Sequence, residues 1–419
     1  MKKTKQISFN ITILFAAICF IFLVGETVVR VFLDEPADNE WVGNPKDFYE
    51  YHPLLGWRNI PNTNKIRIST RGRNKVLYQI NSKGIRGHEY SYKKTNNEYR
   101  IFLLGDSYTE GYVVEFEELF SEIMTNKLNN MGKGINFQAI NSGTSGWSTD
   151  QELLLFQSEG KKYNPDLTIL MFFENDLAYN NQIKDWGMNY KPLFIKKNGK
   201  LVLTNIPVPK PDKIVYNDQL KPEDESTFKW LKLWFHGKSY LYGFIKKRIK
   251  NTYFLNNLAI KLHLKDKPIN EDELLPREYN VWKKTFNESV RESWQITEEM
   301  LILLKNETNS IGSGLLVFFV PNEASVYQEQ WSKIKNNYGF SDENWNIEQV
   351  GIELGAVCKR NSIDFLNPTE LFRTKAKDLE KNKQFLYDPI NKHWNVEGNK
   401  FVGELLTDYI VSKHLKNSQ

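Results

Sequence analysis

The chain has 419 residues, of which 40% are hydrophobic and 26% charged, an ordinary composition for a globular protein with a substantial core. Its 56 Lys and Arg residues against 51 Asp and Glu leave a formal charge of +5, too small a surplus to indicate a nucleic-acid-binding protein. The two cysteines are far apart in the sequence, which excludes a disulfide-framework protein.

The first predicted element is an apolar helix near the N-terminus. Lys2, Lys3 and Lys5 precede the nearly uninterrupted apolar stretch ISFNITILFAAICFIFLV, whose length is near the lower limit of about 17–25 residues for crossing a bilayer. A cleaved signal peptide is the alternative, but LVGETVVRVF offers no A-x-A-like cleavage site. Because basic residues favour the cytoplasmic side, we predict a cytoplasmic tail (1–6), a signal anchor (7–33) and an exported remainder, periplasmic or extracellular.

The next segment, residues 34–95, reads as a tether and an irregular lead-in, since proline, glycine and asparagine interrupt it frequently. From residue 96 the pattern changes to alternating strands and helices. RIFLL, INFQAIN and DLTILMFF are short apolar runs typical of strands in a buried parallel sheet, and helical spacing of apolar residues separates them. This alternation is typical of parallel crossover units, so we predict one α/β domain over residues 96–418.

An insertion interrupts the alternation between about residues 180 and 280. NIPVPKPDK contains too much proline for regular structure, whereas Phe228–Lys250 is basic, aromatic and roughly helical in spacing. We therefore predict a helical insertion. Its apolar stripe could lie on the lipid interface of an anchored protein, or it could pack over the ligand crevice as a lid, which is the more ordinary use of such residues.

A serine follows the first strand of the predicted sheet, in the stretch GDSYTEG. In open parallel sheets, ligands bind beyond the carboxyl ends of the strands. Ser107, placed at a helix N-terminus, would lie beside free backbone N–H groups, which suit a developing oxyanion. A simple glycine turn, with Asp106 or Ser107 capping the following helix, would explain the same residues.

A nucleophilic serine needs a base, because its hydroxyl is barely ionised at neutral pH. Of the six histidines, His393 in YDPINKHWNVEGNKF precedes the final amphipathic helix from a loop that could reach the same sheet edge. Asp388 lies shortly before it and could orient the imidazole, as the acid of a catalytic triad does. The alternative is that the segment around His393 merely caps and packs the start of the last helix.

Four stretches, GDSYTEG, NSGTSGWS, FFENDL and KHWNVEG, occur in the order of the four sequence blocks of the SGNH (GDSL-type) hydrolase superfamily. The chain also resembles the membrane-anchored bacterial members, which place stretches like GWRNIPN and INSKGIRG ahead of the serine. The resemblance spans roughly Tyr51 to His414. It implies a three-layer α/β/α fold of the flavodoxin-like type, with a central, mainly parallel sheet.

The resemblance also implies roles for individual residues. Ser107 matches the family nucleophile and His393 its general base. The oxyanion hole would combine the backbone N–H groups of Ser107 and Gly146 with the side-chain amide of Asn175. Taken alone, Gly146 could be a plain turn glycine and Asn175 a capping residue.

The chain departs from the family pattern in two places. Phe173 stands where a glycine usually precedes the block III asparagine by two residues. The triad aspartate usually lies three or two residues before the histidine, but those positions hold Ile390 and Asn391. Asp388 lies five residues before His393, so either a loop extension or a dyad without aspartate is required.

The expected function is that of an exported, membrane-anchored serine esterase working through an acyl-serine intermediate. A short-chain ester carried by a carbohydrate is the preferred substrate class, and the expected partners are this substrate and the membrane. An O-acyltransferase acting on an envelope or exported polysaccharide is one alternative, and an inactive binding or assembly protein is another. No cofactor, metal ligand spacing or nucleic-acid partner is indicated.

Overall fold

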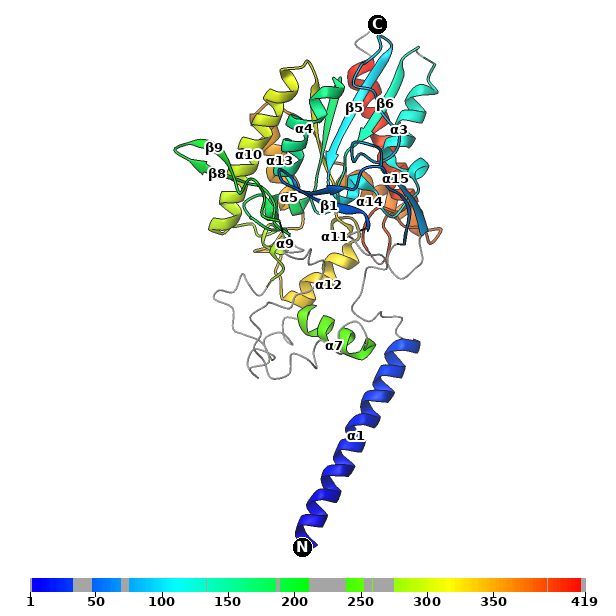
Figure 1. Cartoon of the computed structure of the whole chain (residues 1–419), viewed down its shortest axis with the longest axis vertical. Helices are drawn as coiled ribbons and strands as arrows, with labels where there is room; N and C mark the ends of the chain where they lie inside the picture. The colour runs from blue at the N-terminus through cyan, green and yellow to red at the C-terminus, as the bar shows by residue number, and fades with distance from the viewer. Residues whose placement is uncertain are drawn as a thin grey trace. The chain divides into compact units, whose positions relative to one another are not determined.

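The computed structural model describes residues 2–32, 47–68, 75–132, 134–185, 189–210, 239–251, 258, 275–389 and 391–415 (Figure 1). Contacts divide the chain into two compact units. The smaller unit contains α1 (Lys2–Phe32) and α7 (Tyr240–Asn251), and the larger contains the sheets. The other described α-helices are α2 (Ser107–Glu110), α3 (Phe120–Asn129), α4 (Thr149–Ser158), α5 (Glu174–Tyr179), α9 (Arg277–Asn280), α10 (Glu288–Asn309), α11 (Glu323–Val326), α12 (Gln328–Tyr338), α13 (Gln349–Arg360), α14 (Thr369–Glu380) and α15 (Val396–Ile410).

The larger unit is built on a five-stranded sheet in which every neighbouring pair is parallel. Its order is β11-β10-β7-β5-β6, which corresponds to 2-1-3-4-5 in chain order, the flavodoxin-like arrangement of a doubly wound sheet. The predicted α/β fold with a central parallel sheet is confirmed. The strands are β5 (Glu98–Gly105), β6 (Asn136–Asn141), β7 (Leu167–Phe172), β10 (Gly314–Phe319) and β11 (Asp364–Leu366).

Helices cover both faces of this sheet (Figure 1). Leu103, Ile169 and similarly oriented residues share one buried cluster with α3, α14 and α15. On the opposite face, the ring of Phe102 lies 6.0 Å from that of Phe156 on α4. Successive side chains of a strand point to opposite faces, so burial on both sides explains the continuous apolar runs of these strands.

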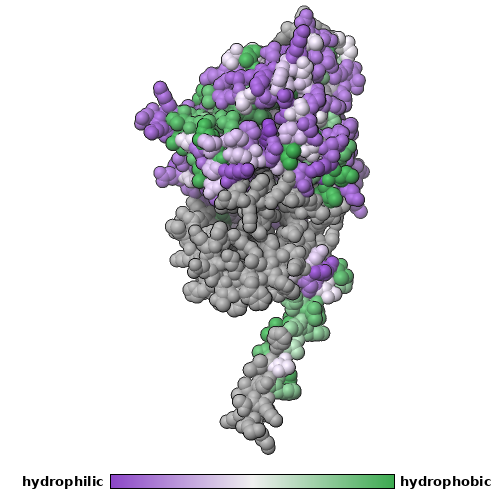
Figure 2. All heavy atoms as spheres, viewed as in Figure 1, coloured by the Kyte–Doolittle hydropathy of each residue, from purple (hydrophilic) through white to green (hydrophobic). Residues whose placement is uncertain are grey.

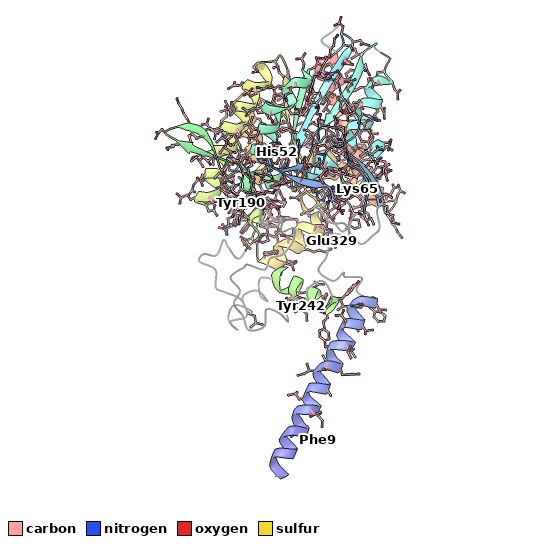
Figure 3. The ribbon with its side chains drawn as sticks, viewed as in Figure 1. Phe9, His52, Lys65, Tyr190, Tyr242 and Glu329 are labelled. Carbon is pink, nitrogen blue, oxygen red and sulfur yellow. The ribbon has the colours of Figure 1, made fainter. Side chains whose placement is uncertain are left out.

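Two antiparallel hairpins precede the sheet in the same compact unit. β1 (Tyr49–His52) pairs with β2 (Gly56–Asn59), and β3 (Asn64–Ile68) pairs with β4 (Lys75–Gln79). Figure 3 labels His52 on the first hairpin and Lys65 on the second. The predicted tether and lead-in therefore contain, from residue 47, ordered strands; residues 34–46 lie outside the described ranges.

The predicted helical insertion is described only in part. It contains an antiparallel hairpin of β8 (Leu193–Lys197) and β9 (Lys200–Thr204), together with α7. An ion pair of 3.0 Å between Lys196 and Glu299 joins the hairpin to α10. Residues 211–238, which include the first half of the predicted apolar stripe, lie outside the described ranges.

The helix α1 contains the segment Thr12–Phe32, which is long and apolar enough to cross a membrane. Large apolar side chains along it, among them Leu14, Phe20 and Leu23, are exposed (Figure 2). Exposure of a continuous apolar surface of this kind is unfavourable in water and favourable in lipid. An N-terminal anchor and a signal sequence both fit this observation.

Candidate active site

The carboxyl ends of β5, β6 and β7 meet at one edge of the sheet because the strands are parallel and adjacent. Ser107 follows β5, the loop containing Gly146 follows β6, and Asn175 follows β7. β6 lies on one side of β5 and β7 lies on the other. The carboxyl ends of the neighbouring strands β5 and β7 therefore form a topological switch point. Ligands of doubly wound sheets bind at such a point.

A tight turn places Ser107 at the first position of α2. Gly105 has φ +155°, and a Cβ built there would lie 2.0 Å from Oγ1 of Thr109, so only glycine fits. Asp106 then caps the helix, because its Oδ1 accepts a hydrogen bond of 2.9 Å from the N–H of Tyr108. Gly111, in the left-handed conformation, ends α2 after a single turn.

Ser107 and His393 lie within hydrogen-bonding distance although 286 positions separate them in the sequence. Oγ of Ser107 is 2.7 Å from Nε2 of His393. The other ring nitrogen, Nδ1, is 2.8 Å from the backbone carbonyl of Asn391. A carbonyl can only accept a hydrogen bond, so Nδ1 carries the proton and Nε2 is left as the acceptor for the serine hydroxyl.

Aromatic side chains surround the imidazole of His393. The ring of Tyr108 stacks on it with centroids 4.6 Å apart, and Tyr112 lies edge-on at 5.1 Å, with its hydroxyl 3.4 Å from Nδ1. Burial lowers the pKa of His393 to about 4, and the charge of Arg67 also lowers it. The hydrogen bond to the Asn391 carbonyl and the charge of Asp388 act in the opposite direction and raise this pKa. The imidazole is therefore neutral at pH 7, as a general base must be.

Asp388 lies in the same loop as His393. Its backbone N–H donates to the carbonyl of His393 (2.7 Å), and its Oδ1 accepts from the N–H of Asn391 (3.0 Å). The carboxylate thus holds the residue whose carbonyl contacts Nδ1, and its charge raises the pKa of His393. This geometry accommodates the five-residue spacing, because the orienting acceptor at 2.8 Å is a backbone carbonyl.

Asn175 connects the segments that carry Ser107 and Gly146. Its Nδ2 donates to Oδ2 of Asp106 (3.0 Å) and lies 3.5 Å from the carbonyl of Trp147. Asp106 precedes the serine and Trp147 follows the glycine. Burial raises the pKa of Asp106 to about 7, although the hydrogen bonds from Tyr108 and Asn175 lower it.

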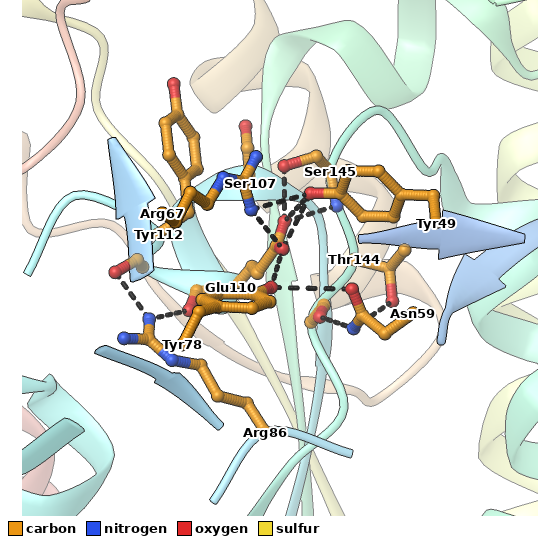
Figure 4. A network of polar contacts seen from close by, with 12 residues as sticks. Tyr49, Asn59, Arg67, Tyr78, Arg86, Ser107, Glu110, Tyr112, Thr144 and Ser145 are labelled. Atoms are coloured by element: carbon orange, nitrogen blue, oxygen red, sulfur yellow. Dashed lines mark hydrogen bonds and ion pairs between the residues drawn. The ribbon is translucent and has the colours of Figure 1, made fainter. Parts of the chain in front are cut away.

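A buried polar network beside Ser107 was missed by the sequence reasoning (Figure 4). Glu110, in the last position of α2, pairs with Arg67 of β3 at 3.0 Å. It also accepts hydrogen bonds from the hydroxyls of Tyr49 (2.7 Å) and Tyr78 and from the N–H (2.7 Å) and hydroxyl of Ser145. The available signal was an acidic residue one helical turn after the serine, in a segment otherwise buried.

Among the described residues, no three His, Cys, Asp or Glu side chains form a group that could hold a metal ion. Of the residues that the sequence singled out for chemistry, Ser107 and His393 are in direct contact, and Asn175 bonds to Asp106 beside the serine. This arrangement can transfer a proton from the hydroxyl to the ring, which is the first requirement for nucleophilic catalysis by serine.

Solved structures similar to this chain include an acetyl xylan esterase, an acetyl-xylooligosaccharide esterase and a GDSL-like lipase. An acetyl xylan esterase is 12% identical, with 74% of this chain and 99% of that chain covered and a TM-score of 0.34. A variant of an acetyl-xylooligosaccharide esterase from Geobacillus is 11% identical (77% and 96% covered, TM-score 0.36). A GDSL-like lipase from Bacteroides thetaiotaomicron is 10% identical (77% and 92% covered, TM-score 0.33).

No protein-family model matches the sequence. No curated protein sequence matches it either. At identities near one residue in ten, the substrates of the structural neighbours do not identify the substrate of this chain.

Proposed function

We propose that this protein is a serine esterase of the SGNH type, with Ser107 as nucleophile and His393 as general base. The observation that carries the proposal is the 2.7 Å contact between Oγ of Ser107 and Nε2 of His393 at the carboxyl edge of the sheet. The hydrogen bond from Nδ1 to the carbonyl of Asn391 supports it, because it fixes the tautomer that the reaction needs.

The reaction proceeds in two halves. Oγ of Ser107 attacks the carbonyl carbon of the ester while Nε2 of His393 takes the hydroxyl proton. The tetrahedral intermediate then expels the alcohol oxygen, which recovers that proton from Nε2, and an acyl-serine remains. Water, deprotonated by the same nitrogen, attacks the acyl carbon. The bond from this carbon to Oγ of Ser107 then breaks, Oγ recovers the proton from Nε2, and the acid is released.

The charge that develops on the carbonyl oxygen needs hydrogen-bond donors. The proposed donors are the N–H groups of Ser107 and Gly146 and the amide of Asn175. The amide of Asn175 lies between the residue before Ser107 and the residue after Gly146, which supports its place at this edge. One of its two N–H groups must leave the 3.5 Å contact with the Trp147 carbonyl to reach the substrate oxygen. The proposed role of Asp388 is indirect: it holds the backbone of Asn391 and stabilises the imidazolium by its charge.

The proposed substrate is a short-chain ester carried by a carbohydrate, a class that comes from the sequence resemblance. Full-length protein in detergent is expected to release p-nitrophenol from p-nitrophenyl acetate faster than from the octanoate, and acetate from an acetylated oligosaccharide. Free acetate should equal p-nitrophenol even with an unacetylated oligosaccharide present in excess. Acetylation of that oligosaccharide would instead identify an acyltransferase, and no turnover of any ester would contradict the proposal.

We also propose that α1 is a retained, single-pass anchor, with its N-terminus cytoplasmic and the α/β domain exported. A contact within the smaller unit supports retention. Glu26 of α1 accepts hydrogen bonds from the hydroxyl of Ser239 (2.7 Å) and from the N–H groups of Tyr240 and Leu241 (2.9 Å each). The carboxylate thus caps the N-terminus of α7, an interaction that removal of α1 would destroy.

The anchor is tested by cell fractionation. Full-length protein carrying an N-terminal epitope should keep the epitope and stay in the membrane at alkaline pH, because the apolar span is embedded in lipid. A chain lacking residues 1–33 is the control and should be extracted. Loss of the epitope from the exported protein would show that α1 is a signal sequence.

A further inference from the structure

The peptide between Ser145 and Gly146 carries the N–H group that the proposed function assigns to the oxyanion hole. It is the central peptide of a four-residue turn closed by a 3.2 Å hydrogen bond from the N–H of Trp147 to the carbonyl of Thr144. Gly146 has φ +78°, the value that a type II turn requires at its third residue. Type I and type II turns differ mainly by rotation of this central peptide, so its orientation has to be held.

A tryptophan of the lead-in holds the carbonyl side of that peptide. Nε1 of Trp57, on β2, donates a 2.9 Å hydrogen bond to the carbonyl oxygen of Ser145. Nε1 of Trp147 donates in return to the carbonyl of Trp57 (3.1 Å), and Nδ2 of Asn59 reaches Oγ1 of Thr144 (3.4 Å). β2 is therefore bonded to the turn at several points.

The same contact determines where the N–H of Gly146 points. The only cis peptide among the described residues is Ile206–Pro207, so the Ser145–Gly146 peptide is trans and planar. Its N–H consequently points away from the carbonyl that faces Trp57. This N–H has no hydrogen-bond partner among the described residues, which leaves it free for a substrate oxygen.

Glu110 holds the turn from the other side. Its Oε2 accepts from the N–H of Ser145 at 2.7 Å and from the Ser145 hydroxyl. Arg67 neutralises the buried carboxylate, and Gly143 packs so closely that a Cβ there would lie 2.3 Å from the N–H nitrogen of Glu110. Glu110 belongs to α2, the short helix that also carries Ser107. The four-residue turn from Thr144 to Trp147 is therefore fixed relative to the serine.

We propose that the lead-in positions the oxyanion hole, with Trp57 of the lead-in and Glu110 of α2 as positioning residues that present the N–H of Gly146. The inference rests on the proposed function. It assigns to residues 47–95 a part in turnover, although they supply none of the reacting groups. Loss of the Trp57 donor would let the central peptide rotate and turn the N–H away.

The test compares Trp57→Phe with Trp294→Phe in the full-length protein. Phenylalanine keeps an apolar ring and removes only the indole N–H. Trp294 is a matched control because its side chain is also buried and its Nε1 has no hydrogen-bond partner among the described residues. Trp57→Phe should lower kcat for p-nitrophenyl acetate about tenfold to a hundredfold, up to the effect of losing one oxyanion donor, with KM changed less than about twofold.

Glu110→Gln should give the same split between kcat and KM, because one amide oxygen then replaces two carboxylate oxygens. Arg67 and Tyr49 donate to Oε1 and hold the amide oxygen there, so the NH₂ group faces the N–H of Ser145 and cannot accept from it. Labelling of Ser107 by a fluorophosphonate should slow in parallel, since the phosphoryl oxygen uses the same donors. If Trp57→Phe and Trp294→Phe behave alike in both assays while the wild type is active, the inference is wrong and the proposed esterase stands. If the wild type neither turns over esters nor reacts with the fluorophosphonate, the proposed function itself fails.

Discussion

Replacing Ser107 by alanine is expected to reduce kcat for p-nitrophenyl acetate by about 10⁴-fold to 10⁶-fold, the range found when the nucleophile of a serine hydrolase is removed. The hydroxyl lies 2.7 Å from Nε2 of His393, so it is the hydroxyl whose proton the imidazole can take. The rate should be measured as p-nitrophenol release, and covalent labelling by a fluorophosphonate should disappear with it.

Ser158→Ala is the matched control for Ser107→Ala. Ser158 also belongs to a helix, and among the described residues its hydroxyl bonds only to carbonyls of the preceding turn, at 2.7 Å from Leu154 and 3.4 Å from Leu155. Its replacement should leave kcat within about twofold, as is usual for a surface substitution. Wild-type activity in Ser107→Ala would exclude Ser107 as the nucleophile.

The arrangement of the sheet could be predicted because its strands are buried on both faces. The runs RIFLL and DLTILMFF coincide with β5 and β7, and alternation with helices indicated that the strands are parallel. A meeting of Ser107 and His393 was a prediction, because Ser107 follows a strand and His393 precedes the last helix in a loop that could reach the same edge. Their catalytic roles stay proposals.

The acceptor on the imidazole could not be predicted from residue types. Every residue carries a backbone carbonyl, so no letter in the sequence distinguishes the carbonyl of Asn391 from any other. The sequence indicated only an unusual spacing between Asp388 and His393. In the structure the carboxylate of Asp388 accepts from the N–H of Asn391, and the carbonyl of Asn391 accepts from Nδ1 of His393.

The lead-in was predicted as irregular because its strands are short and its glycines and prolines are frequent. Glu110 and Arg67 are residue types that are rarely buried unless they are paired, and here they pair with each other. Pairing between residues 43 positions apart, across two different elements, leaves no local pattern that a sequence reader can detect.

His393→Ala is expected to lower kcat/KM by about 10⁴-fold or more at pH 7, because the serine loses the group that takes its proton. The wild type should show an acid limb that His393→Ala lacks. The base of the wild type is the neutral imidazole of His393, and burial lowers the pKa of this group to about 4. Activity should therefore persist at pH 5 and fall as the pH drops through about 4, since the protonated ring cannot accept the hydroxyl proton.

The variant Asp388→Ala tests whether the Asp388 carboxylate orients the imidazole itself or acts through the backbone of Asn391. Asp388 raises the pKa of His393, so its removal should move the acid limb to still lower pH. The carboxyl of Asp106 has a pKa of about 7 and would add an inflection near that pH to the profiles of both the wild type and Asp388→Ala. Arg67 stays charged over the whole pH range of the assay. Because the carbonyl of Asn391 still holds Nδ1, kcat should fall only about tenfold, well short of the loss in His393→Ala. A loss as large as that of His393→Ala would show that Asp388 orients the ring itself, as the acid of a full triad.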